Sequence, residues 1–289
     1  MQPPSKDGEL GTETDINENQ MLCYHRLGTP QSSDPVLWRD PAHPQRMCGA
    51  SVTEDGQYVV LSISEGCVPA NLLSVIDLTA IPRTESQALD LSAYDLDAAA
   101  ASAPTPLPIT HLVTEFVGSF DYVANIGSTF TWHSNHLAPR YRLVRCDVAT
   151  PTEPATWDVV VPEHEAHVLS WAHAMRGDAL FTCYLVDVKD VLELRSLATG
   201  LLEKILPLPG LGSVVSFSGR RRDSEFFFKF ASFTDPGSIF RGDLDQLGDG
   251  TIEWELLRRP VRTRGSCSRS SRSRSHSSSS SRIYSSSIV

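Results

Sequence analysis

Alternation of hydrophobic and polar residues divides most of this chain into short strands. The clearest unit spans residues 44–78. Its β-branched and aromatic run 58–63 predicts a half-buried strand. An Asp-Gly turn at 55–56 joins this strand to the small-residue run 47–52, because glycine adopts a positive φ at no steric cost. A third strand over 72–78 follows a loop. Strand, tight turn, strand, loop and strand are typical of one β-propeller blade.

Further strands of the same character follow along the chain. They are expected at 21–27, 36–38, 109–117, 128–133, 141–148, 157–161, 168–173, 179–185, 191–197, 201–208, 214–218, 225–231 and 237–244. No segment alternates strands with long amphipathic helices, so a parallel α/β sheet is not expected.

The strands recur with a nearly constant period. The positions that close each unit are Leu27, Asp77, Asp147, Ser196 and Asp243, separated by 50, 70, 49 and 47 residues. The longest interval contains an Ala/Pro-rich stretch within 81–110, which we expect to loop out on the surface. Without this insertion of roughly 20 residues, the period fits propeller repeats of about 40–50 residues. The fold class is therefore all-β, a partial β-propeller with about four full blades and fragments of others.

Composition adds few further constraints. The 289 residues are 40% hydrophobic and 21% charged, as in ordinary globular proteins. No apolar run approaches the roughly 20 residues that cross a bilayer. Residues 1–20 are polar and lack the apolar core of a signal peptide, so we expect a polar loop or frayed start. A cytoplasmic protein without a membrane partner is the expectation.

The cysteines and histidines predict no metal site and no cofactor. The six cysteines form no CxxC pair, which favours free thiols in a reducing compartment. Two histidine pairs, His133 with His136 and His164 with His167, are closely spaced. Both pairs fall in strand or loop context, where we expect solvated or hydrogen-bonded side chains.

The charge of the chain is divided unevenly. The net charge is −10, yet residues 258–289 carry eight Arg and no Asp or Glu, which leaves −18 for residues 1–257. Nucleic acid is therefore an unlikely partner for the acidic part. Residues 265–289 include 14 Ser, and we expect an Arg/Ser-rich disordered tail from residue 258. This tail either binds RNA or is phosphorylated, or it is unrelated sequence that replaces a continuation of the fold.

Several short sequence motifs, taken in order, resemble those of one known family. They are Tyr24-His25-Arg26-Leu27-Gly28-Thr29, Glu65-Gly66-Cys67, Val161-Pro162-Glu163-His164-Glu165, Cys183-Tyr184-Leu185 and Phe230-Ala231-Ser232-Phe233-Thr234. Their order and spacing over residues 10–257 resemble the propeller of the prolyl oligopeptidases, which are serine peptidases of the cytosol. The resemblance implies a seven-bladed propeller, of which residues 21–257 would form the later part.

The same resemblance implies two substrate-facing residues. Met47 and Cys67 match propeller residues that line the substrate cleft of the family, opposite the hydrolase domain. A flexible thioether adapts to varied side chains, which suits Met47 to such a role. Ser64 departs from the family, which often places a basic residue before Glu65. The implied partners are short proline-containing peptides and a hydrolase domain that is missing from this chain.

The sequence contains no recognisable serine-peptidase machinery. Such an enzyme needs a nucleophile elbow, an oxyanion hole, an acid and a histidine on an α/β-hydrolase domain. There is no Gly-x-Ser-x-Gly, and Ser218 and Ser266 lack its flanking glycines. His164 is a tempting base, but in the family its motif lies on the propeller. We therefore expect no catalytic residue and no activity from the chain alone.

Three functions remain open. The chain is a truncated, substrate-gating propeller segment of a peptidase that cleaves short peptides after proline, a stand-alone propeller that binds peptides or proteins, or an RNA-associated protein acting through its tail. Open blade faces expose apolar surface. We therefore expect the isolated chain to be marginally stable or aggregation-prone unless it recloses with fewer blades or dimerises.

Overall fold

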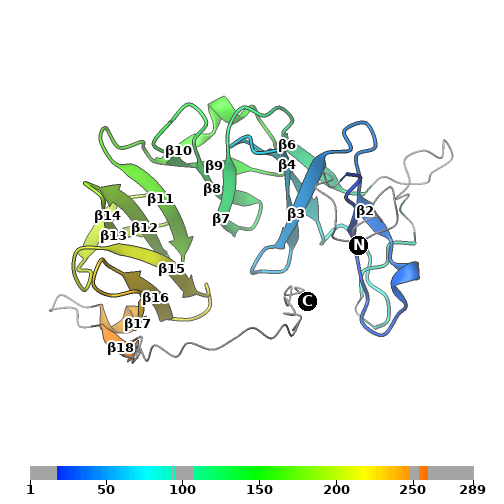
Figure 1. Ribbon diagram of the computed structural model, residues 1–289. Coiled ribbons are helices and arrows are strands. Elements are labelled where there is room, and N and C mark those ends of the chain that lie inside the picture. Colours follow the sequence, from blue (N-terminus) through cyan, green and yellow to red (C-terminus); the bar gives the residue numbers. More distant parts are fainter. Residues whose placement is uncertain (1–17, 87, 93, 95–106, 248–253, 260–289) are drawn as a thin grey trace, which may run out of the picture.

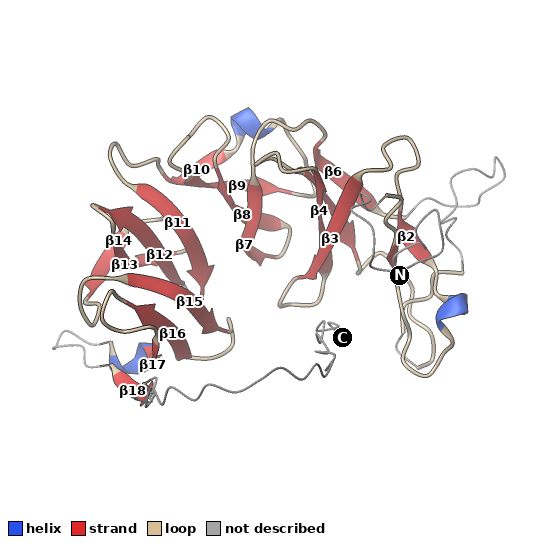
Figure 2. Ribbon diagram, in the orientation of Figure 1, coloured by secondary structure: helices blue, strands red, loops and turns tan. Residues whose placement is uncertain are grey.

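The chain folds into four similar sheets, as the computed structural model shows for residues 18–86, 88–92, 94, 107–247 and 254–259. These residues hold strands and three 3-10 helices of 3 residues each (Figure 2). The first sheet contains β3 (Arg46–Val52), β4 (Tyr58–Glu65), β5 (Leu72–Asp77) and β6 (Ile109–Val113). The second contains β7 (Phe120–Ile126), β8 (Thr129–Ser134), β9 (Arg142–Asp147) and β10 (Asp158–Val161). The third contains β11 (Val168–Ala174), β12 (Ala179–Val186), β13 (Lys189–Ser196) and β14 (Leu202–Leu206). The fourth contains β15 (Ser213–Gly219), β16 (Glu225–Ala231), β17 (Ser238–Asp243) and β18 (Glu255–Arg258).

The four sheets are the blades of an open propeller. Each is an antiparallel meander in which chain order and spatial order agree. They follow one another around an arc, with the first strands β3, β7, β11 and β15 on its concave side and the fourth strands outside (Figure 1). The prediction of an all-β partial propeller with about four full blades is confirmed.

Three details of the sequence-based strand prediction were wrong. Asp77, Asp147, Ser196 and Asp243 end the third strand of each blade, and a fourth strand follows outside it. The strand expected at 21–27 is only β1 (Leu22–Cys23), because the chain turns over residues 27–29. Strand β18 was not predicted, and it extends to Arg258, the first residue assigned to the tail. Residues 1–17 of the predicted start, 95–106 of the predicted insertion and 260–289 of the predicted tail lie outside the described residues.

The blades are held together by apolar side chains in the seams between neighbours. Strand side chains alternate between faces, so each inner blade supplies one face to each seam. The seam of the first and second blades buries Leu73, Val75, Phe130 and Trp132, among others. The seam of the third and fourth buries Phe181, Phe226 and Phe228. A smaller cluster around Leu143 and Leu180 joins the middle blades.

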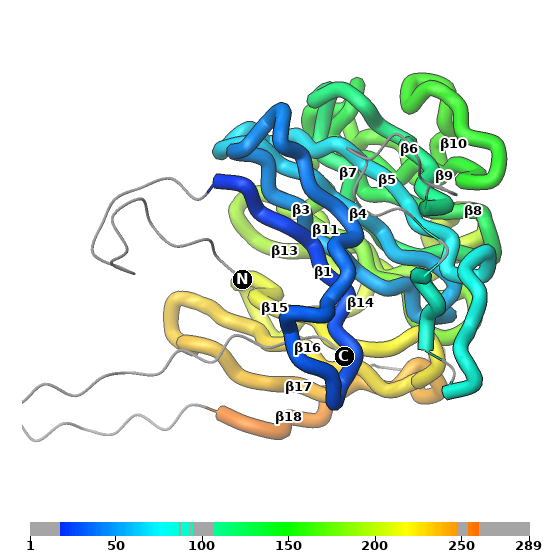
Figure 3. Tube along the Cα trace, turned by 90° about the vertical axis from the view of Figure 1, so that its right-hand side faces the viewer, coloured from blue at the N-terminus to red at the C-terminus, as the bar shows by residue number. Residues whose placement is uncertain are grey.

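The amino-terminal segment covers the free face of the first blade. Strand β1 pairs with β2 (Val36–Trp38) in a two-stranded sheet. Leu22, Tyr24, Leu37 and Trp38 pack against buried residues of the first blade such as Leu61. Figure 3, a view from this end of the molecule, shows the segment lying across the first blade. The fragment of a further blade therefore protects an apolar face that would otherwise be open.

The other end of the arc is only partly apolar. Phe226 and Phe228 face the seam, so their neighbours Phe227 and Glu225 lie on the outer face of the fourth blade. There Arg241 forms ion pairs with Glu225 and, at 2.7 Å, with Glu255. Paired charges on an outer face discourage association with another sheet. The expected exposure of apolar surface at this end is therefore reduced.

A polar link recurs between successive blades. The Asn71 side chain, just before β5, accepts a hydrogen bond from Phe120 N–H (2.7 Å) and donates to Phe120 O (3.1 Å). Asp190 in the third blade likewise accepts from Val214 N–H at 2.7 Å. Each link ties the beginning of a third strand to the inner strand of the next blade. At the equivalent place in the fourth blade stands Gly237, which has no side chain to offer.

The first and fourth blades also meet directly. Arg221, in the turn between β15 and β16, donates its N–H to Glu54 Oε2 at 2.7 Å. Its guanidinium donates to Asn125 O (3.3 Å) and Gly177 O (3.4 Å). Glu54 and Gly177 lie in the turns between the first and second strands of the first and third blades, and Asn125 lies near the end of β7 in the second blade. One arginine thus gathers all four blades at one end of their inner strands.

The turn between β12 and β13 is strained. Asp187 (φ 47) and Val188 (φ 60) both adopt the left-handed conformation that a two-residue hairpin requires. A β-branched residue is poorly suited to this region, which costs roughly 1–2 kcal/mol. Val188 is 93% exposed, so no packing compensates for the strain. We expect Val188→Gly to raise the free energy of unfolding by about 1 kcal/mol in urea titrations.

Val215→Gly is the matched control for this prediction. Val215 is also an exposed valine, but it lies at a bulge in β15 and does not have a positive φ, so glycine relieves no strain there and loses more backbone freedom on folding. Its replacement should lower the free energy of unfolding by about 1 kcal/mol. A loss of stability in Val188→Gly would show that the valine is not strained.

Candidate functional site

One end of the propeller collects the loops that connect successive blades. We call this end the Met47 rim. It contains the segments before each inner strand (39–45, 114–119, 162–167 and 207–212) and the turns between second and third strands (66–71, 135–141, 187–188 and 232–237). A backbone hydrogen bond joins the two sets from Asn71 N–H to Gly118 O (3.0 Å), and Asp190 N–H, in β13 just after the turn at 187–188, donates likewise to Gly212 O (3.0 Å). Propeller loops at one rim converge around the central opening, which makes such a rim suitable for ligands.

Met47 and Cys67 both belong to this rim and to the first blade. Met47 is the second residue of β3 and pairs with Ser64 on β4. Cys67 follows the end of β4 after the tight turn at Gly66 (φ 61). The Met47 side chain is 41% exposed, and Cys67 is exposed. Two soft, sulfur-containing side chains are therefore accessible at the same end of one sheet.

Arg46, the residue before Met47, is held by several contacts of its side chain. Its guanidinium pairs with Asp40 (2.9 Å) and with Glu65 (3.0 Å) and lies 5.4 Å from the Phe116 ring centroid. Burial tends to raise the pKa of Asp40, but hydrogen bonds from His43 and Arg46 outweigh it, so the pKa lies below its usual value. Asp40 therefore stays ionised. The charged groups beside Met47 are paired with one another rather than free.

Cys67 differs from the buried cysteines in its environment. Burial raises the pKa of the Cys48 thiol to about 12 and that of Cys146 to about 11. Burial also raises the pKa of Cys183. These three thiols remain protonated and inaccessible, whereas Cys23 and Cys67 are exposed. Thiol chemistry can therefore be directed to Cys67 once Cys23 and Cys267 are replaced.

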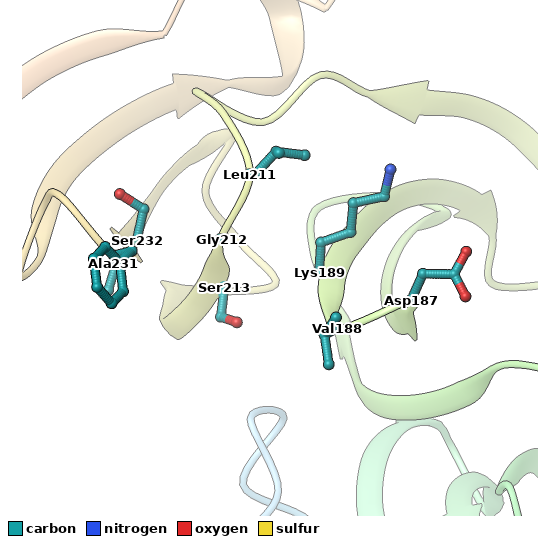
Figure 4. Close-up of a pocket in the computed structure, with 9 residues that line it drawn as sticks. Asp187, Val188, Lys189, Leu211, Gly212, Ser213, Ala231 and Ser232 are labelled. Carbon is teal, nitrogen blue, oxygen red and sulfur yellow. The ribbon is translucent and has the colours of Figure 1, made fainter.

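A hollow of about 480 Å³ lies elsewhere on the rim, between the third and fourth blades. Figure 4 shows Val188 and Lys189 on one side, Leu211 above and Ser232 on the other side. Val188, Leu211 and Phe233 are 93%, 77% and 107% exposed. Three open apolar side chains around one hollow are typical of a surface that contacts another protein segment. The sequence signal was the Phe within the turn Ser232–Gly237, where polar residues are usual.

The histidines singled out in the sequence are engaged in structural contacts. His164 Nδ1 accepts hydrogen bonds from the N–H groups of Ala166 and His167, both at 3.0 Å, and its ring stacks on His167. His136 approaches Val117 O at 3.1 Å. Since the nitrogen of His164 that would act as a base is occupied by its own loop, this residue is poorly placed for acid–base chemistry.

The closest approach to a serine nucleophile is Ser74 with His111. Ser74 Oγ lies 2.9 Å from His111 Nδ1 across β5 and β6. Ser74 is buried at 4% exposure within the sheet, and in the described part of the chain no carboxylate bonds to His111. A triad needs an accessible nucleophile, a third group that orients the base and an oxyanion hole. This pair is therefore a cross-strand contact.

Among residues 18–86, 88–92, 94, 107–247 and 254–259, no three His, Cys, Asp or Glu side chains gather as metal ligands. Over the same ranges, no helix is long and apolar enough to span a bilayer.

Comparison with known proteins places this architecture in one family. Residues 3–249 match the model of the prolyl oligopeptidase N-terminal β-propeller domain. Prolyl oligopeptidase A of Galerina marginata is 29% identical over 236 residues, which are 82% of this chain and 28% of that protein. Prolyl endopeptidase of Elizabethkingia miricola is 26% identical over 83% of this chain and 29% of its own length.

Solved structures agree with the sequence matches. Prolyl oligopeptidase B from Galerina marginata, bound to a 35mer hydrolysis and macrocyclization substrate, superposes with a TM-score of 0.70 at 26% identity. The match covers 86% of this chain and 31% of that one. The chain thus spans less than a third of the length of these relatives, and the matched part is the propeller. The chain belongs to the prolyl oligopeptidase family, within its N-terminal β-propeller domain.

Proposed function

We propose that this chain is the peptide-facing propeller of a prolyl-oligopeptidase-type serine peptidase, with Met47 and Cys67 in contact with short proline-containing peptides. The observation that carries the proposal is the exposure of both side chains at one end of the first blade in a chain of this family. The related prolyl oligopeptidase B was solved with a peptide substrate, which supports peptides as partners.

Hydrolysis in this proposal belongs to a hydrolase domain that docks on the Met47 rim. The open apolar side chains Val188, Leu211 and Phe233 offer it a contact surface on the same rim. The chain itself supplies the cover that selects peptides by size. The cytoplasm is the proposed location, supported by the free thiols of Cys23, Cys48, Cys67, Cys146 and Cys183.

An environment-sensitive fluorophore on Cys67 tests the peptide contact. In a Cys23→Ser/Cys267→Ser background, Cys67 is the accessible thiol among the described cysteines. Titration with acetyl-Gly-Pro-amide should change its emission in a saturable way, and Met47→Ala should weaken binding about 3- to 10-fold through lost apolar contact. No turnover of a Gly-Pro reporter peptide is expected from these 289 residues.

Cys23 provides the control position for the same experiment. It is exposed and lies on β1, in the two-stranded sheet outside the first blade. A fluorophore there, in a Cys67→Ser/Cys267→Ser background, should not respond to the peptide. Equal responses at Cys23 and Cys67, or none at Cys67, would contradict the proposed peptide contact.

A stand-alone binding module is the second candidate function. The observation in its favour is the contact of Arg221 with Glu54, which joins the first and fourth blades within one chain. A monodisperse monomer with one cooperative thermal transition would favour this candidate. Aggregates or dimers that disperse when a hydrolase domain is added would favour the peptidase propeller.

A further inference from the structure

The backbone next to Met47 is held from outside the sheet. Strand β3 lies at the edge of the first sheet, beside β4. In an antiparallel ladder, the N–H and C=O groups of alternate residues point away from the neighbouring strand. At Cys48 these groups meet a side chain: its N–H donates to Gln20 Oε1 at 2.6 Å, and its O accepts from Gln20 Nε2 at 3.3 Å. One carboxamide therefore stands where a peptide group of a further strand would lie.

Gln20 reaches β3 because the chain turns at Asn19. This residue has φ 57, in the left-handed region that asparagine adopts more readily than most residues. Its N–H donates to Pro44 O at 2.7 Å, just before β3 begins. Two consecutive residues thus bind the same edge. The oxygen of the Gln20 amide meets a donor and its nitrogen meets an acceptor, so each end of the amide has a suitable partner.

Met47 lies between two fixed residues. Arg46 donates its N–H to His43 O at 3.0 Å, in addition to the ion pairs of its side chain. Cys48 is 4% exposed and belongs to the buried cluster of the first blade, while Gln20 holds its backbone. Met47 itself is 41% exposed. Since its thioether side chain is flexible, the backbone on either side decides where it can lie.

We propose that Gln20 is a positioning residue for the peptide contact of Met47. This inference rests on the proposed function and adds to it a residue outside the first blade. The Gln20 amide fixes Cys48, and the fixed strand presents Met47 to the peptide. Side chains that bind a ligand need a supporting layer of hydrogen bonds to hold their geometry. Without Gln20 the end of this edge strand would fray, and peptide binding would have to order it first.

Hydrogen exchange at the Cys48 amide tests the hydrogen bonds themselves. In Gln20→Ala, the Cys48 N–H should exchange with solvent about 10-fold faster, as the loss of one hydrogen bond allows. Gln31→Ala is the matched control, because Gln31 is an exposed glutamine of the same segment, in η1 (Gln31–Ser33). It should leave the exchange of Cys48 unchanged. Unchanged exchange in Gln20→Ala would overturn the proposal.

A double-mutant cycle tests whether Gln20 acts through Met47. Calorimetric titration with acetyl-Gly-Pro-amide gives the affinity of the 289-residue chain, of Gln20→Ala, of Met47→Ala and of the double variant. Gln20→Ala should weaken binding about 3-fold when Met47 is present and less than about 1.5-fold when Met47 is alanine. A general weakening of the fold would instead lower the affinity equally in both backgrounds. All titrations are made well below the thermal unfolding of each variant.

The outcomes separate this inference from the function on which it rests. If Met47→Ala weakens binding but Gln20→Ala does not, or if Gln20→Ala acts equally in both backgrounds, Gln20 is not a positioning residue and the Met47 contact stands. If Met47→Ala binds the peptide as tightly as the unchanged chain, the proposed contact is wrong, and the role of Gln20 is wrong with it.

Discussion

Trp132→Ala should lower the free energy of unfolding by about 3–5 kcal/mol, the largest loss expected from one substitution in this chain. Trp132 is fully buried in the seam of the first and second blades. Its ring stacks on Phe130 at 5.5 Å and meets Tyr122 edge-on at 6.0 Å. Its Nε1 donates to Cys146 Sγ at 3.2 Å. Alanine leaves a cavity that aromatic neighbours on fixed strands cannot close.

Equilibrium unfolding in urea measures this loss. Trp132→Phe keeps most of the volume and should cost about half as much, which provides a folded variant if alanine prevents folding. Leu137→Ala serves as the control, because Leu137 is 67% exposed in the same blade. It should change stability by no more than about 0.5 kcal/mol. A loss below about 1 kcal/mol in Trp132→Ala would show that the seam does not hold the blades together.

Asn71→Ala is expected to cost about 3 kcal/mol through lost hydrogen bonds rather than lost volume. Asn71 is a buried residue, 7% exposed, and Phe120 is 1% exposed. The Asn71 side chain bonds to both the N–H and the O of Phe120. Alanine leaves both of these backbone groups without a partner, and a buried unsatisfied group costs roughly 1–3 kcal/mol. In this variant the backbone N–H groups of β7 should also exchange their hydrogens with solvent faster.

Ser62→Ala separates the two roles of Asn71. Ser62 Oγ accepts from Asn71 Nδ2 at 2.8 Å, but it plays no part in the bonds to Phe120. Its removal should cost only about 1 kcal/mol and leave exchange along β7 unchanged. If Ser62→Ala and Asn71→Ala were equally destabilising, the link between the blades would contribute little.

Most of the fold could be predicted from the strand patterns. Alternation within runs such as 58–63 and the period of about 50 residues were enough to predict four blades, because each blade repeats the same local grammar. The fourth strands were harder. β18 consists of exposed Glu255, Leu256, Leu257 and Arg258, so its pattern has no buried face to mark it. Such an edge strand is recognised by its hydrogen bonds to the neighbouring strand, here β17, and the sequence alone does not show that pairing.

The candidate site was predicted less completely than the fold. Met47 and Cys67 came from resemblance, and their contact with peptides stays a prediction. A hollow of about 430 Å³ between the second and third blades, lined among others by Asp121, His133 and Leu169, was not foreseen. Asp121 and His133 lie 12 positions apart on neighbouring strands, and Leu169 comes from another blade. In the sequence, His133 stands out only through its close spacing to His136. The groups that a histidine contacts depend on the strands packed beside it, and only the folded chain supplies these.

The contact between Arg221 and Glu54 also sets an order of events during synthesis. The two residues are 167 positions apart. At a ribosomal rate of about 5–20 residues per second, the first blade waits about 10–30 s for its partner to be made. The seams between consecutive blades need no such delay, because each forms as soon as the next blade emerges. We therefore expect the blades to pack one after another as they are synthesised. The contact that joins the first blade to the fourth forms only after the turn between β15 and β16 has left the ribosome.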